Sequence, residues 1–98
     1  MGLDPIEAAL NHLSEMYGTL FVVSAGNDGP GFETVSSPGT AEAALTVGAV
    51  DDTNQVASFS SRGLTVENHA LKPDIVAPGV DIIAARAAGT GLGNPMND

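Results

Sequence analysis

Two short apolar segments most constrain the fold of this chain. Residues 19–25 read TLFVVSA and residues 44–50 read ALTVGAV, without the alternation of apolar and polar side chains that a half-exposed strand shows. Such runs are typical of strands buried on both faces of a parallel sheet. A third run at 80–85, VDIIAA, predicts a further strand, and a shorter apolar stretch at 74–78 ends in proline.

A helix is expected over residues 4–17, before the first of these strands. Asp4 suits the N-cap, Pro5 the first helical position, and Gly18 the left-handed residue that ends a helix. Apolar side chains recur on one face at Ile6, Ala9, Leu10, Leu13, Met16 and Tyr17. A helix followed by buried strands and a glycine-rich turn predicts one flank of a layered α/β fold.

The composition excludes several kinds of partner. The 98 residues fit one domain and carry twelve acidic side chains against three basic ones, a net charge of −9. Nucleic-acid binding is excluded, because it requires clustered Lys and Arg. No apolar run reaches membrane-spanning length, so no membrane partner is expected. Residues 87–98 lack an apolar period and are expected to form a flexible tail.

The segment SAGNDGPG at 24–31 directly follows the apolar run TLFVV, and it could be a phosphate loop, a tight turn or a site that stabilises an oxyanion. It matches neither glycine-rich phosphate motif, no lysine lies nearby, and Asp28 would repel an anion. The two histidines lack metal-ligand spacing, and no serine lies in a G-x-S-x-G motif. Ser58, Ser60 and Ser61 are expected to bond to local backbone.

Four segments in a fixed order are more specific: SAGN at 24–27, TVGAV at 46–50, FSSRG at 59–63 and KPDIVAPG at 72–79. In sequence and order they resemble the subtilisin-like serine proteases (subtilases), over about residues 18–86. The resemblance implies that residues 1–98 are part of a subtilase catalytic domain, between its His motif and its Ser motif. It implies the α/β class, as a fragment of the family's three-layer fold with a mostly parallel sheet. It also implies a secreted parent enzyme that hydrolyses peptide bonds through an acyl-serine.

The resemblance assigns roles to residues around the first segment. It implies that Asn27 lines the oxyanion hole, where an uncharged carboxamide can donate to the negative oxygen of a tetrahedral intermediate. It implies that Ser24, Ala25 and Gly26 form a wall of the substrate pocket, with Ser36 near its far end.

A weak cation site is a further implication of the resemblance. The stretch SPGTAEAA at 37–44 is similar to a loop that, in some subtilases, binds a cation through backbone carbonyls. The implied ligands are Gly39, Ala41, Ala44 and Asp74. Calcium or a monovalent cation is therefore one alternative and a loop without a cation is the other; no cofactor is expected to be required.

The motifs that carry the family's catalytic Asp, His and Ser do not occur in the chain. Because acylation requires an activated nucleophile with a base in reach, the isolated chain is expected to be inactive. Its expected partners are the remainder of the catalytic domain and a peptide or protein substrate. The alternative is a non-catalytic module, derived from a subtilase, that binds extended peptides by strand addition and pocket contacts.

Overall fold

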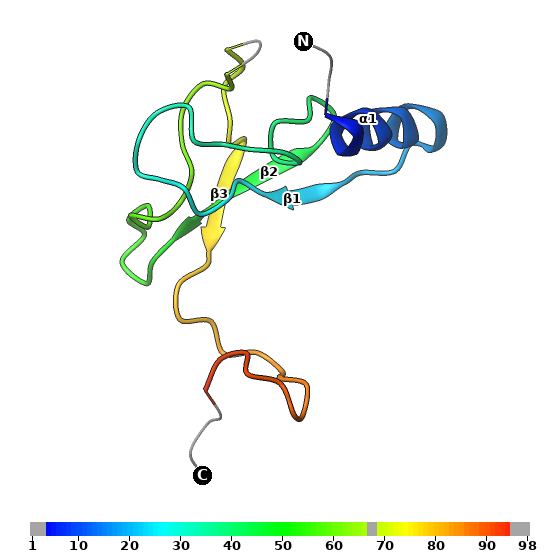
Figure 1. Ribbon diagram of the computed structural model, residues 1–98. Helices are drawn as coiled ribbons and strands as arrows, with labels where there is room; N and C mark the ends of the chain where they lie inside the picture. The colour runs from blue at the N-terminus through cyan, green and yellow to red at the C-terminus, as the bar shows by residue number, and fades with distance from the viewer. Residues whose placement is uncertain (1–3, 67–68, 95–98) are drawn as a thin grey trace.

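The computed structural model describes residues 4–66 and 69–94, which contain one helix and three strands. The elements follow the order α1 (Pro5–Tyr17), β1 (Val22–Ser24), β2 (Leu45–Val50) and β3 (Ile75–Pro78). The strands form one sheet in the order β1-β2-β3, and both pairs are parallel (Figure 1). The predicted α/β class with a parallel sheet is confirmed.

Local capping sets both ends of α1. The Asp4 carboxylate accepts a hydrogen bond from the Ile6 amide at 2.8 Å, which satisfies one of the free donors of the first turn. Gly18 has a φ of 66°, and its amide donates to the Ser14 carbonyl at 2.9 Å. The predicted helix is thus confirmed, with Asp4 as its cap.

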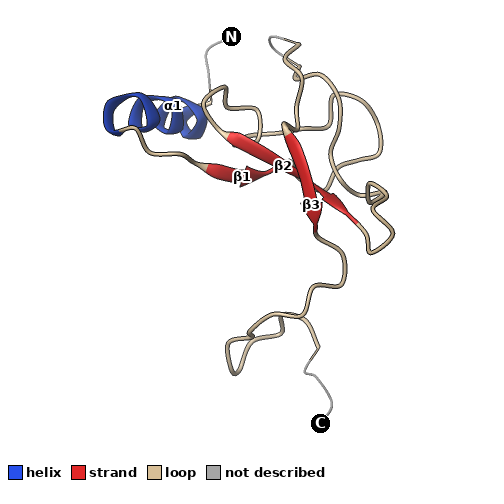
Figure 2. Ribbon diagram, turned by 180° about the vertical axis from the view of Figure 1, so that it is seen from behind, coloured by secondary structure: helices blue, strands red, loops and turns tan. Residues whose placement is uncertain are grey.

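The helix packs where the chain enters β2 (Figures 1 and 2). Leu10 forms a small core with Ala41 and Ala44, and the half-buried residues against this core are Phe21, Val23 and Ala43. The Asn11 side chain accepts a hydrogen bond from the Ala43 amide at 3.0 Å. This contact joins the helix to the loop before β2.

The sheet register brings the carboxyl ends of the strands to one edge. β1 pairs with β2 from Val22 with Leu45 to Ser24 with Val47, and β2 pairs with β3 from Val47 with Ile75 to Val50 with Pro78. Because all three strands run in the same direction, the segments after β1 and β3 leave the sheet on the same side (Figure 2).

The expected strand at 80–85 is wrong. β3 is instead the shorter apolar stretch, and it ends at Pro78. The Gly79 amide donates to the carbonyl of Val50 at 3.0 Å, and Val50 is the last residue of β2. Past this point β2 has no further residue to pair with, so 80–85 form no strand and run out from the sheet (Figure 1). Of the expected flexible tail, residues 95–98 lie outside the described residues.

The expectation that the strands are buried on both faces is also wrong. In β2 the alternate residues Thr46, Gly48 and Val50 are buried, whereas those between them are only half-buried. The buried face is covered by loops, and Pro73 and Ser60 lie against Gly48. On the other face Val22 is 61% exposed, because none of the described residues packs over it. A run without alternation therefore does not by itself establish two covered faces.

Candidate functional site

A groove of about 410 Å³ lies at the carboxyl edge of the sheet. It is lined by residues 22–27, 47–49, 59–60 and 77–79. These residues come from all three strands, from the segments that follow β1 and β3, and from the FSSRG segment. The structure therefore brings Ser24, Ala25, Gly26 and Asn27 together on one concave surface.

The turn after β1 places Asn27 at the groove. The Ala25 amide donates to the carbonyl of Val47 at 2.9 Å, which keeps the chain in the sheet up to that residue. Gly26 then has a φ of 106°, which side chains rarely tolerate, and Asn27 follows with an exposed side chain. Ser36 is not among the residues that line the groove, but its Oγ lies 3.6 Å from where a Cβ on Gly26 would be.

The FSSRG segment holds the backbone on both sides of Asn27. The Ser61 amide donates to the carbonyl of Gly26 at 3.0 Å, and the Asp28 amide donates to the Ser61 hydroxyl at 2.9 Å. The Gly29 amide also donates to the carbonyl of Phe59 at 2.9 Å. We call these three hydrogen bonds the 59–61 clamp. They fix the peptide units before and after Asn27, so its position depends on a segment more than thirty residues away.

The expectation that Ser60 and Ser61 bond to local backbone is wrong. Their side chains are buried, and each accepts a hydrogen bond from a distant amide. The Ser60 hydroxyl accepts from the Ala49 amide of β2 at 3.0 Å, and the Ser61 hydroxyl accepts from Asp28. A buried hydroxyl satisfies backbone donors wherever the fold brings them, which sequence distance does not reveal.

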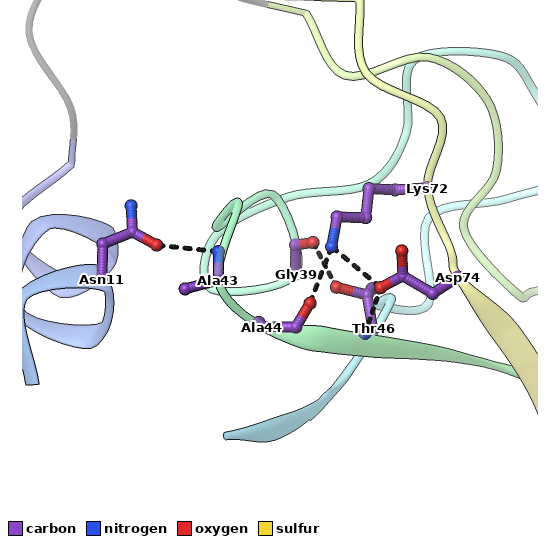
Figure 3. Close-up of polar contacts among 7 residues, drawn as sticks. All are labelled: Asn11, Gly39, Ala43, Ala44, Thr46, Lys72 and Asp74. Atoms are coloured by element: carbon purple, nitrogen blue, oxygen red, sulfur yellow. Dashed lines mark hydrogen bonds and ion pairs between the residues drawn. The ribbon is translucent and has the colours of Figure 1, made fainter. Parts of the chain in front are cut away.

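Three of the four residues of the implied cation site, Gly39, Ala44 and Asp74, lie together near the start of β2 (Figure 3). The fourth, Ala41, is hydrogen-bonded to Ala44 in the same loop. The Gly39 carbonyl accepts from the Thr46 hydroxyl at 2.7 Å. The Ala41 carbonyl accepts from the Ala44 amide at 3.2 Å. Each of these two backbone oxygens therefore already has a donor from the chain.

The other two implied ligands share one donor, the Lys72 ammonium. Its Nζ lies 2.8 Å from the carbonyl oxygen of Ala44 and 2.8 Å from Oδ2 of Asp74 (Figure 3). The same Oδ2 accepts from the Thr46 amide at 2.8 Å. The bond from Lys72, followed by that from Thr46, holds the pKa of Asp74 below its usual value. The Lys72 side chain is only 6% exposed.

The roles of Lys72 and Ser61 do not follow from the motifs alone. Lys72 is the only lysine of the chain and lies two residues before Asp74. This spacing is the one sequence signal that could have predicted their ion pair. Among residues 4–66 and 69–94, no three His, Asp or Glu side chains are grouped so that they could hold a metal ion. His12 and His69 are both exposed.

Comparison with known proteins decides the family. A family model described as the subtilase family matches residues 2–97. The chain belongs to the subtilase family. It is 52% identical to the serine protease AprX of Bacillus subtilis over an alignment of 77 residues. It is 37% identical to pyrolysin of Pyrococcus furiosus over an alignment of 111 residues, to which this chain contributes 86% of its own length. It is 36% identical to a thermophilic serine proteinase of a Bacillus strain over 97 residues.

These matches cover 71%, 86% and 92% of the subtilase chain described here, but only 17%, 8% and 22% of the three relatives. The chain thus spans less than a quarter of the length of each of these proteases. In the part of this subtilase that the structure describes, no helix is both long and apolar enough to cross a membrane.

Proposed function

We propose that this subtilase chain is a segment of a secreted serine endopeptidase, in which Asn27 donates a hydrogen bond to the oxyanion. One observation carries the proposal: Asn27 is exposed on the groove while the backbone on both sides of it is held by the 59–61 clamp. A donor carried on a fixed backbone needs less reorganisation to stabilise developing charge. Because a carboxamide does not titrate, this donor is available at any working pH.

The proposed substrate is a peptide that lies along the groove. Ser24, Ala25 and Gly26 supply one wall, and Ser36 lies next to Gly26, where the far end of the pocket is proposed. The proposed pocket is completed by the remainder of the catalytic domain. The nucleophile and its base are proposed to come from there too, so the 98-residue chain alone cleaves nothing.

The first experiment tests the inactivity of the chain. It is incubated with a fluorophosphonate probe, which labels activated serines, and with a fluorogenic peptide. We expect neither labelling nor cleavage, because a serine without a base in reach is a poor nucleophile. Robust labelling of the chain would contradict this part of the proposal.

The second experiment tests Asn27 where all catalytic groups are present. Residues 18–86 replace the matching segment of the Bacillus subtilis protease AprX, and the chimera is compared with its Asn27→Ala variant. We expect kcat to fall about 10²–10³-fold with little change in KM, the loss already known for subtilisin when such a donor is removed. Unchanged kcat in an active chimera would refute the role.

A second carboxamide serves as the matched control. Because Asn11 lies outside this segment, the graft is extended to residues 4–86 for the control, and Asn11→Ala is made in the extended chimera. This change removes the hydrogen bond to Ala43 but nothing in the groove. We expect it to lower the melting temperature slightly and to leave kcat unchanged. A fall in kcat as large as that of Asn27→Ala would indicate a general loss of structure.

A further inference from the structure

We propose that the Lys72 ammonium is a built-in cation that holds the 39–44 loop in place of a metal ion. The loop of this chain then needs neither calcium nor a monovalent cation. The inference does not depend on the proposed catalytic role of Asn27, because the two sites share no residue.

The first argument is that the oxygens are already engaged. Lys72 Nζ lies 2.8 Å from the Ala44 carbonyl and 2.8 Å from Asp74 Oδ2, and Thr46 donates to both Asp74 and the Gly39 carbonyl. A calcium ion would have to approach such oxygens to about 2.3–2.6 Å. It could not do so while the ammonium lies between two of them, and the two positive charges would repel each other.

The second argument concerns where the chain places its charge. The chain carries twelve acidic side chains, a net charge of −9 and one lysine, whose ammonium would stay hydrated without any desolvation cost if it were exposed. Instead the Lys72 side chain is 6% exposed. Burial of an ammonium is costly unless it is paired and hydrogen-bonded, and here both conditions are met.

The third argument is that the ammonium makes the connection expected of a metal ion in this position. It joins the last residue of the 39–44 loop to Asp74, which directly precedes β3. The Asp74 amide also donates to the Thr46 carbonyl at 2.8 Å, so this corner is closed by backbone and side chain together. One positive charge therefore ties the start of β2 to the start of β3.

The test compares cation dependence of stability in the unaltered chain and in Lys72→Glu. Melting temperatures are followed by circular dichroism at constant ionic strength with calcium, sodium, potassium or a chelator, and calcium binding is measured by calorimetry. We expect the unaltered chain to respond equally to all conditions and to show no calcium binding. Lys72→Glu should melt lower with chelator and gain roughly 5 °C in a saturable manner with calcium.

Control variants distinguish an effect at the Lys72 site from an effect of the changed net charge. Arg86→Glu makes the same charge change at an exposed position in the segment after β3 and should gain nothing specific from calcium. If Lys72→Glu does not fold, Lys72→Gln takes its place in the comparison, with the same direction expected. Saturable calcium binding by the unaltered chain that Asp74→Asn abolishes would overturn the proposal, as would a folded Lys72 variant that binds no cation.

Discussion

Replacement of Gly29 by alanine tests the 59–61 clamp most directly. A Cβ on Gly29 would lie 2.0 Å from the Ser60 carbonyl oxygen and 2.7 Å from its carbon. These are backbone atoms, and the Ser60–Ser61 segment is anchored by the bonds from Ser60 to Ala57 and from Ser61 to Gly26. The contact cannot be relieved by a side-chain rotation, so the two segments must separate.

The size of the effect follows from that geometry. Carbon and oxygen atoms need well over 3 Å, so the segments must move apart by more than 1 Å and the bond from Gly29 to Phe59 must lengthen. Overpacking of this kind costs about 1–3 kcal/mol, and the rigid backbone favours the upper end. A chain of this length has a free energy of unfolding of about 5–15 kcal/mol, so the loss is measurable.

The assay is urea unfolding followed by far-ultraviolet circular dichroism, with Gly31→Ala as the matched control. A Cβ on Gly31 would meet only the Thr34 methyl group at 3.7 Å, an ordinary contact. We expect Gly31→Ala to leave the free energy of unfolding unchanged or to raise it by about 0.5 kcal/mol, and Gly29→Ala to lower it by about 3 kcal/mol. Equal stability of the two variants would refute the clamp as described.

Three further predictions concern single polar groups. Ser61→Ala should lower the free energy of unfolding by about 1 kcal/mol, because the Asp28 amide loses its acceptor; unchanged amide exchange at Asp28 would contradict this. Asp4→Ala should cost about 1 kcal/mol and increase amide exchange in the first helical turn; unaltered exchange there would count against the cap. Hydrogen bonds hold the pKa values of Asp4, Asp51 and Asp74 below the usual 3.8, so their stabilisation is present above that pH and is lost as the pH falls through the lower folded-state values. A urea midpoint that stayed constant in strong acid would contradict this.

The parts of the fold that depend on near neighbours were predictable from the sequence. The bounds of α1 follow from the capping bonds of Asp4 and Gly18, which reach residues within four positions. The places of β1 and β2 follow from their apolar runs. The apolar runs do not decide whether 74–78 or 80–85 forms the third strand, because both are apolar. Pairing with β2, which ends at Val50, decides it.

The candidate site divides in the same way. The order of the motifs indicated residues 24–27 as candidate site residues, and the structure places them in one groove. The motifs did not indicate that Ser61 bonds to a residue 33 positions away, or that Lys72 bonds to a carbonyl 28 positions away. Such contacts depend on how the loops return to the sheet.

The 59–61 clamp also has a consequence for the order in which the chain folds. Its bond between Asp28 and Ser61 closes a loop of 33 residues. Loop closure of that length costs about 3 kcal/mol of chain entropy, whereas α1 closes only short local turns. The helix can therefore form early. The groove acquires its shape only after residues 59–61 have docked against β2 and the turn after β1. This delay keeps Asn27, the proposed oxyanion donor, out of position until the sheet around it is complete.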